Sequence, residues 1–317
     1  MCCRWPSDEE RADAATGSAP PMNAPLRRGL GLMLTVAPGV AWISVFLFLP
    51  SLLMGLLAFM TNGQYGQPTL PLTDSAFVQV AGYSFLGWSP GNLLVIWRSL
   101  TQAFYTTVAT ALLAYPLAFF IAGARERYRP ILLLLVIVPS WTNQVVRTYA
   151  WMQILAPETW LSHLAISLGL LPQHMGLYPS GFAVSMGLVY NYLPYMVLPI
   201  YASVEKLDWR LVDAVRDLYA SGWRVFRHGV FPQTVPGLLA GIILVAIPAF
   251  GAYIVPQLLG GDRSVLLGNL IAQQFSSMPN WPFGAALTLV MLVFTFGGLV
   301  VFRRMARRLN AGEANLL

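Results

Sequence analysis

The sequence predicts an all-α membrane protein with six transmembrane helices and a pair of amphipathic helices between the fourth and fifth spans. Only 10% of its 317 residues are charged and 56% are hydrophobic, and the mean hydropathy is +0.61. Soluble domains are much more polar than this. The apolar residues fall into segments of about 20 residues, long enough to cross a hydrocarbon core of about 30 Å. The basic residues cluster in short runs between these segments, which is the pattern of membrane topology.

The first 28 residues are polar and show no apolar periodicity, so we expect a disordered tail over 1–28 and a membrane domain over 29–317. The tail does not resemble a signal peptide, because no short apolar core closely follows its basic residues. Met22 is a plausible alternative start. The two cysteines, Cys2 and Cys3, match no disulfide framework or metal-binding spacing.

Six apolar segments follow the tail. The first is long enough to tilt in the bilayer. The third is the least regular, because Asn143, Gln144 and Arg147 lie in its second half. The expected spans are 30–60, 95–124, 130–156, 180–203, 235–258 and 283–302.

The distribution of arginine and lysine predicts that both termini are cytoplasmic. Only Arg98, Arg147 and Arg263 fall on or near the other side of the membrane. The segments expected to be cytoplasmic are the tail, 125–129, 204–234 and 303–317, and the outer loops are then 61–94, 157–179 and 259–282.

Residues 205–237 form one charged segment between two apolar spans. Asp208 is expected to cap a helix, with Leu207 and Val212 packing across its first turn. Gly222 is expected to end this helix, and Pro232 to end a shorter second one. The helix is amphipathic, with Leu211, Val212, Val215, Leu218 and Tyr219 on one face and Arg210, Asp213, Arg216 and Asp217 on the other.

Several kinds of chemistry are missing from the sequence. Lys206 is the only lysine and follows no glycine-rich loop, so a phosphate-binding loop is excluded and any nucleotide must bind to another chain. The basic residues form no patch suited to nucleic acid. The spans contain no carboxylate, which argues against an ion-coupled secondary transporter. That alternative stays open, because backbone carbonyls can also bind sodium.

We expect no catalytic or metal site. Gly87-Trp88-Ser89-Pro90-Gly91 matches the G-x-S-x-G pattern of serine hydrolases, but Pro90 stands where the required helix should start. A turn in an outer loop is the simpler interpretation. The three histidines, His163, His174 and His228, are too scattered for a triad or a metal site.

Asp213-Ala214-Val215, followed by Tyr219 and by Val230-Phe231-Pro232, resembles the coupling motif of bacterial ABC-importer permeases. Tyr219 replaces the glycine expected in the turn of that motif, and Gly229 replaces an aliphatic residue. Either the turn has moved to Gly222, or Tyr219 stays helical. Further segments resemble the spermidine/putrescine-type permeases, namely 146–151, 187–194, 198–203, 254–261, 268–271 and 280–286.

The resemblance implies a permease of the bacterial inner membrane that imports a polyamine such as putrescine or spermidine, or alternatively opines or other amino compounds. It implies an ABC ATPase dimer that binds ATP and Mg²⁺, a second permease subunit in a heterodimer, and a periplasmic or lipid-anchored solute-binding protein, besides membrane lipids. This chain would then bind no cofactor. The implied ATPase-coupling residues are Asp213, Ala214, Val215, Asp217, Leu218, Tyr219, Ala220, Ser221, Gly222, Phe231 and Pro232.

Two further groups of residues lie in the spans. Gly237 and Gly241 have the G-x-x-x-G spacing that allows close helix packing, and a gating hinge is the alternative. Prolines in the spans kink helices or free carbonyl groups. Aromatic side chains can stack on cationic amines, although packing explains most of them. The candidates for a translocation path are Arg147, Tyr149, Trp151, Tyr190, Asn191, Tyr192 and Tyr253.

Overall fold

The computed structural model describes residues 24–84, 87–169, 176–218, 221–261, 264–277 and 279–314. The chain divides into two compact units, Met1–Leu53 and Met54–Leu317. Helix α2 (Ala24–Ala58) runs through the boundary between them. Because α2 begins at Ala24, the last residues of the tail expected over 1–28 are helical. The rest of that tail lies outside the described residues.

Most of the expected spans are long single helices. In the described part of the chain, five helices are long and apolar enough to cross a membrane, and a bent helix pair provides a sixth candidate. This confirms the mainly helical, membrane-spanning fold. The five are 36–58 in α2, α4 (Gly91–Gly123), α8 (Gly181–Glu205), the continuous run 222–250, and 281–304 in α14 (Trp281–Ala314).

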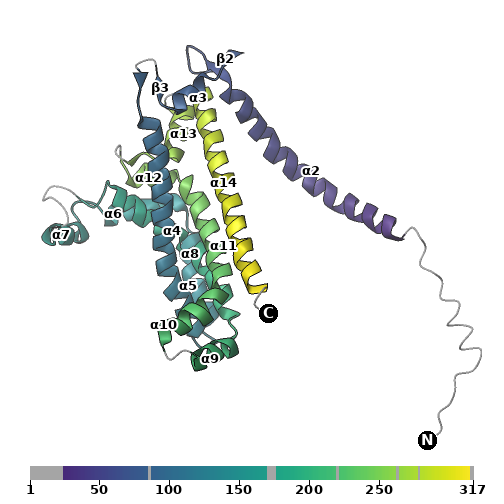
Figure 1. Ribbon diagram of the computed structural model, residues 1–317. Coiled ribbons are helices and arrows are strands. Elements are labelled where there is room, and N and C mark those ends of the chain that lie inside the picture. Colours follow the sequence, from purple (N-terminus) through teal and green to yellow (C-terminus); the bar gives the residue numbers. More distant parts are fainter. Residues whose placement is uncertain are drawn as a thin grey trace, which may run out of the picture. The chain divides into compact units, whose positions relative to one another are not determined.

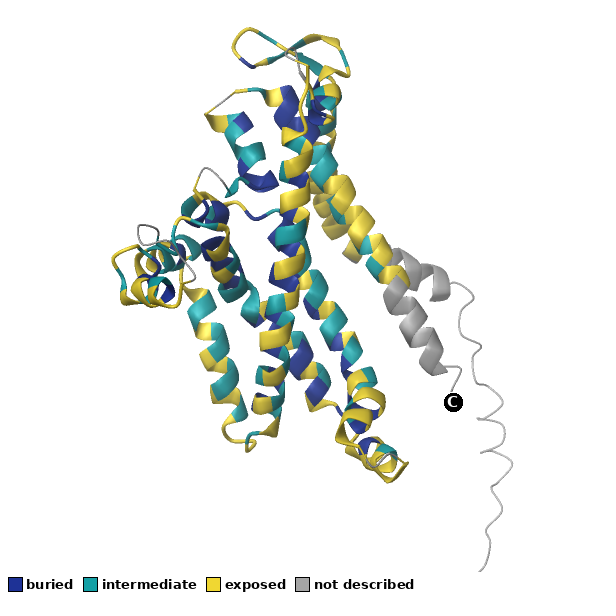
Figure 2. Ribbon diagram, turned by 60° about the vertical axis from the view of Figure 1, so that its left-hand side comes forward, coloured by how far each residue is buried: buried dark blue, intermediate teal, exposed yellow. Residues whose placement is uncertain are grey.

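In the second unit, α4, α8 and α11 (Phe231–Phe250) pack against one another more extensively than any other helices (Figure 1). Their shared core contains Ala114 and Ala118 of α4, Met196 and Ile200 of α8, and Val245 of α11. Small side chains on α4 face larger ones on α8, so the two helices approach closely. Figure 2 shows that buried residues gather where the long helices face one another.

The third expected span, 130–156, is broken. It consists of α5 (Arg129–Trp141) and α6 (Gln144–Ile154), which meet at an angle of 91°. Thr142 has an extended backbone, and the Asn143 side chain caps α6 by accepting a hydrogen bond from the Val145 N–H at 2.8 Å. A capping side chain makes a new helix start favourable at that point.

The fifth span differs from its expected limits of 235–258 at both ends. Helix α10 (Gly222–Val225), a π turn η1 (Phe226–Val230) and α11 follow one another without a gap. The sequence predicted that Pro232 ends the preceding helix. This prediction is wrong, because Pro232 lies in the first turn of α11. In the π turn the Phe231 N–H donates to the Phe226 carbonyl, five residues back. The proline, which has no N–H to donate, follows directly after this widened turn.

At its other end α11 stops at Phe250, and the short helix α12 (Ile254–Leu259) follows after three residues. Helix α13 (Leu267–Ser276) packs against α14. Its Gly268 lies so close to the break that a Cβ atom there would be 2.6 Å from the Ala252 carbonyl oxygen. The break between α11 and α12 is thus held against a neighbouring helix.

Among the described residues, two short hairpins interrupt the helical fold, and they lie in the expected outer loop 61–94 except for Met60, just before it. Strands β1 (Met60–Asn62) and β2 (Pro68–Leu72) are antiparallel, as are β3 (Tyr83–Ser84) and β4 (Gly87–Trp88). The short helix α3 (Ser75–Val80) lies between them, and α7 (Trp160–Ser167) lies in the second expected outer loop. In Figure 1, α3 and β3 lie at the opposite end of the bundle from α9 (Trp209–Leu218) and α10.

Candidate functional site

Helix α9 begins where the sequence predicted. The Arg210 N–H donates to the Asp208 carboxylate at 2.9 Å, and the Val212 N–H donates to the Asp208 carbonyl at 3.3 Å. Leu207 and Val212 are both buried, 6% and 2% exposed. The cap and the apolar contact across the first turn therefore hold α9 at its N-terminus.

One face of this helix pair is part of the main core. Val212 of α9, Val225 of α10 and Val230 of η1 are buried in the same cluster as Met196 and Ile200 of α8. Gly229 lies where α9 crosses η1, and a Cβ atom there would be 3.4 Å from the Val215 Cβ. That is ordinary van der Waals contact, so the crossing has room for a methyl group.

A hydrogen-bonded bridge ties α9 to the span that follows it. The Asp208 N–H donates to Gln233 Oε1 at 3.0 Å, and Gln233 Nε2 donates to the Gly229 carbonyl at 2.8 Å. Gln233 was not among the residues expected to matter. The signal for it in the sequence is a long polar side chain in the first turn of an apolar span.

The other face of the pair is exposed and partly apolar. Leu211 and Leu218, expected on the same apolar face as Val212, are 51% and 79% exposed, and Trp223 is 67% exposed. A cleft of about 340 Å³ opens between the helices. It is lined by Trp209, Val212, Arg216, Gly222, Val225, Phe226 and Val230.

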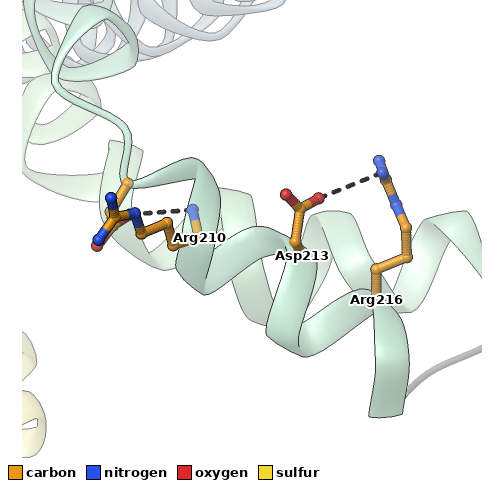
Figure 3. Close-up of polar contacts among 4 residues, drawn as sticks. Arg210, Asp213 and Arg216 are labelled. Atoms are coloured by element: carbon orange, nitrogen blue, oxygen red, sulfur yellow. Dashed lines mark hydrogen bonds and ion pairs between the residues drawn. The ribbon is translucent and has the colours of Figure 1, made fainter.

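Most of the other described residues of the motif are also exposed. Asp213 and Arg216 project from α9 and form an ion pair (Figure 3). Their charged atoms are 3.4 Å apart, and both side chains are 67% exposed. Such an exposed pair contributes little to stability. Tyr219 and Ala220 lie outside the described residues. Ala214, Asp217, Ser221, Gly222 and Phe231 are exposed, whereas Val215 and Pro232 are partly buried.

The hydrolase-like pattern at Ser89 has more local structure than expected. Strand β4 precedes Ser89, and α4 starts at Gly91 with Pro90 as its N-cap, so Pro90 does not prevent a helix from starting there. The strand is only two residues long and belongs to a two-stranded hairpin. His163 lies on α7 and His228 in η1, while His174 falls outside the described residues. Across the described ranges no group of three His, Cys, Asp or Glu side chains is placed to hold a metal ion.

The path candidates are only partly brought together. The rings of Trp151 on α6 and Tyr190 on α8 pack edge to face, 5.4 Å apart. The Tyr192 hydroxyl donates to the carbonyl of Pro248, a proline inside α11, at 3.1 Å. Asn191 is buried at 3% exposure. Tyr149 and Tyr253 are each nearly half exposed, and Arg147 is partly buried.

The two spaced glycines lie at the contact between α11 and α8. A Cβ atom at Gly237 would be 2.3 Å from both the Pro199 carbonyl oxygen and Ser203 Oγ. At Gly241 it would be 2.5 Å from the Met196 sulfur. These approaches are too close for any side chain unless the neighbouring groups move.

Comparison with known proteins identifies one family. Residues 114–311 match the family described as binding-protein-dependent transport system inner membrane component. The spermidine/putrescine transport system permease protein PotB of Haemophilus influenzae is 36% identical over 277 residues, covering 87% of this chain and 94% of the relative. PotB of Escherichia coli is 37% identical over 275 residues, covering 86% and 96%. The E. coli inner membrane ABC transporter permease protein YdcU is 31% identical, covering 90% and 92%.

Solved structures share the fold at low sequence identity. One is a chain of a bacterial alginate ABC transporter in complex with an alginate pentasaccharide-bound periplasmic protein. It aligns with a TM-score of 0.67 and 15% identity, covering 90% of this chain and 97% of that chain. A second structure, of a bacterial ABC transporter involved in the import of alginate, aligns with a TM-score of 0.62 and 16% identity, covering 89% and 97%.

Proposed function

Because the chain belongs to the family of binding-protein-dependent transport system inner membrane components, we propose that it is the permease subunit of an ABC importer for polyamines such as putrescine or spermidine. The observation that carries this proposal is the 36–37% identity to the PotB proteins over most of both chains. The apolar helices support a multi-pass inner-membrane protein. Its role is alternating access across the membrane, without covalent chemistry.

The energy for transport comes from a partner. The surface formed by α9, α10 and η1 docks against an ATPase dimer, which binds ATP and Mg²⁺. The exposed Leu218 and Trp223 provide apolar contact area for that partner. The bridge from Asp208 to Gln233 supports a role in transmission, because it ties the docked helix directly to the fifth span. Rigid connections transmit rigid-body movement better than flexible loops do.

The orientation follows the basic residues. Both termini and the α9–α10 pair face the cytoplasm, since arginine is concentrated in those segments. A periplasmic or lipid-anchored solute-binding protein then approaches from the opposite side, where the hairpins β1–β2 and β3–β4 lie. A second permease subunit in a heterodimer completes the pathway. Gly237 and Gly241 serve close packing of α11 on α8, and the residues around Tyr190 and Tyr192 line the path.

The test is reconstitution of the chain with its ATPase, second permease and binding protein in proteoliposomes. We expect putrescine or spermidine, presented by the binding protein, to stimulate ATP hydrolysis and to accumulate inside the vesicles. The control is the same preparation without the binding protein. Uptake that follows an ion gradient and needs no ATP would support an ion-coupled secondary transporter instead.

A further inference from the structure

In the part of the chain that the structure describes, two buried amide oxygens have no hydrogen-bond partner. Among the described residues, the buried side-chain polar atoms without a partner are Arg147 Nε, Asn191 Oδ1 and Asn269 Oδ1. Asn191 is 3% exposed and Asn269 is 2% exposed. Leaving such a group unpaired is unfavourable, because it has lost its hydrogen bonds to water without replacement. Stability alone therefore does not explain why an unpaired oxygen is buried here, and a functional role is a natural explanation.

The nitrogen atoms of both amides are already engaged. Asn269 Nδ2 donates to the Tyr253 carbonyl at 3.2 Å and to Gln257 Oε1 at 2.8 Å, so both of its hydrogens are used. Asn191 Nδ2 donates to the Gly187 carbonyl at 2.8 Å. With the nitrogens fixed in this way, each oxygen remains as an acceptor with free lone pairs.

The two asparagines come from different helices that press on the same broken segment. Asn191 lies one turn after Gly187 on α8. A Cβ atom added at Gly187 would be 2.7 Å from Leu259 and 2.8 Å from Val255, both of which belong to α12. Asn269 directly follows Gly268 on α13. Gly268 lies against the carbonyl of Ala252, in the break between α11 and α12. The Asn269 amide therefore borders the segment from the end of α11 to the end of α12, and Asn191 lies one turn from the point where α8 packs against α12.

The chemistry of these oxygens fits a cationic amine. An ammonium group has N–H donors only, and it needs acceptors to replace the water that it loses inside a membrane. The expected spans contain no carboxylate to serve this purpose. Interrupted helices are also where transporters commonly place substrate sites, because their backbone is irregular there. Arg147 is a cation and a donor, so it is excluded as an ammonium ligand.

We propose that Asn191 and Asn269 supply the acceptor oxygens that receive the ammonium groups of the transported polyamine at the break between α11 and α12. This inference rests on the proposed polyamine function. Both oxygens are enclosed in the present conformation, so they become available when α12 separates from α8 and α13 during the transport cycle. The asparagines thereby replace the missing carboxylates with neutral acceptors, which hold a cation weakly enough to release it.

The test compares two substitutions at each position in the assembled complex in proteoliposomes. Asn191→Leu removes the acceptor, and we expect at least a tenfold loss of putrescine uptake. The melting temperature of the complex should stay the same or rise, because the unpaired oxygen is gone. Asn191→Asp keeps an acceptor in place and should retain uptake. The same contrast is expected between Asn269→Leu and Asn269→Asp.

The matched control is Asn92→Leu, which removes an amide whose nitrogen donates to the Gln79 carbonyl at 2.8 Å, away from the break. It should leave uptake within twofold of wild type. If Asn191→Leu also stays within twofold, the inference is overturned while the proposed function stands. If Asn191→Leu and Asn191→Asp both lose uptake together with melting temperature, Asn191 is structural and the inference is again overturned. A wild-type complex that takes up no polyamine overturns the proposed substrate, and this inference with it.

Discussion

The backbone N–H of Asp208 donates to the side-chain oxygen of Gln233 at 3.0 Å, and the two residues are 25 positions apart in the chain. Asp208 is also the residue whose carboxylate caps α9. One residue thus fixes the start of the exposed helix and joins it to the first turn of the fifth span. In the proposed transporter, this bridge would pass a displacement of α9 by the ATPase on to α11.

Replacing Gln233 should uncouple the two helices. Gln233→Leu removes both the acceptor for Asp208 and the donor to the Gly229 carbonyl. We expect ATP hydrolysis to continue while the number of polyamine molecules taken up per ATP falls several-fold. Gln233→Glu retains the acceptor alone and should be intermediate. Equal transport per ATP in wild type and Gln233→Leu would show that the bridge plays no part in transmission.

The exposed apolar side chains of α9 and α10 should matter for assembly and not for folding. Leu218 is 79% exposed, and surface substitutions away from packed features usually change stability by less than about 0.5 kcal/mol. We therefore expect Leu218→Ser to leave the melting temperature of the isolated permease unchanged and to reduce co-purification with the ATPase about tenfold. The control is Leu70→Ser on β2, where the leucine is 76% exposed at the other end of the molecule. Equal co-purification of both variants would contradict the docking surface.

Tyr219 lies outside the described residues, and its role in the turn remains a prediction. A tyrosine rarely adopts the positive φ that a glycine in this turn would allow. We expect Tyr219→Gly to leave assembly with the ATPase intact, as measured by co-purification. Loss of assembly in this variant would show that the tyrosine itself contacts the partner.

Two glycines should respond oppositely to alanine. Gly237→Ala places a Cβ atom 2.3 Å from the Pro199 carbonyl oxygen, so α11 must shift away from α8, at a cost of about 1–3 kcal/mol. Gly229→Ala places it at ordinary contact distance from Val215. That change should be neutral or stabilising by about 0.5–1 kcal/mol, because alanine favours the helix. Thermal unfolding in detergent measures the stability of both variants. Similar melting temperatures for the two would contradict the close packing of α11 on α8 at Gly237.

A buried hydrogen bond between distant segments should anchor α13. The Leu267 N–H donates to Ser99 Oγ at 2.7 Å, and both residues are fully buried. Ser99→Ala leaves this N–H without a partner, so we expect a loss of about 1–3 kcal/mol of stability. Ser276→Ala on the same helix is the control and should change little, because that exposed hydroxyl bonds locally, to the Ala272 carbonyl and the Ser277 hydroxyl. A small effect at Ser99 would show that another group satisfies the Leu267 N–H.

Much of the fold could be predicted from hydropathy alone. A membrane core offers no water to unpaired backbone groups, so an apolar segment of sufficient length must be helical. For the same reason the spans were located to within a few residues where they are uninterrupted, as in α4 and α8. The cap at Asp208 was equally predictable, because it depends on residues two to four positions away.

The breaks were harder to predict, because hydropathy does not report backbone direction. The 91° bend between α5 and α6 falls inside one apolar segment and depends on the local cap at Asn143. A proline such as Pro232 predicts the end of a helix. In the structure a π turn precedes it, and the helix continues into α11. In the same way, Leu211 and Leu218 share an apolar face with Val212, but of these three only Val212 is buried in the core.

By itself the sequence determined the mainly helical, membrane-spanning fold, the approximate position of the uninterrupted spans and the resemblance to a permease family, since these depend on composition and local order. Only the tertiary structure decided which polar groups find partners. Asp208 meets Gln233, and Ser99 meets Leu267 across 168 residues, whereas the oxygens of Asn191 and Asn269 meet none. Such pairings depend on how helices that are distant in the chain pack together. Short-range sequence patterns do not contain this information.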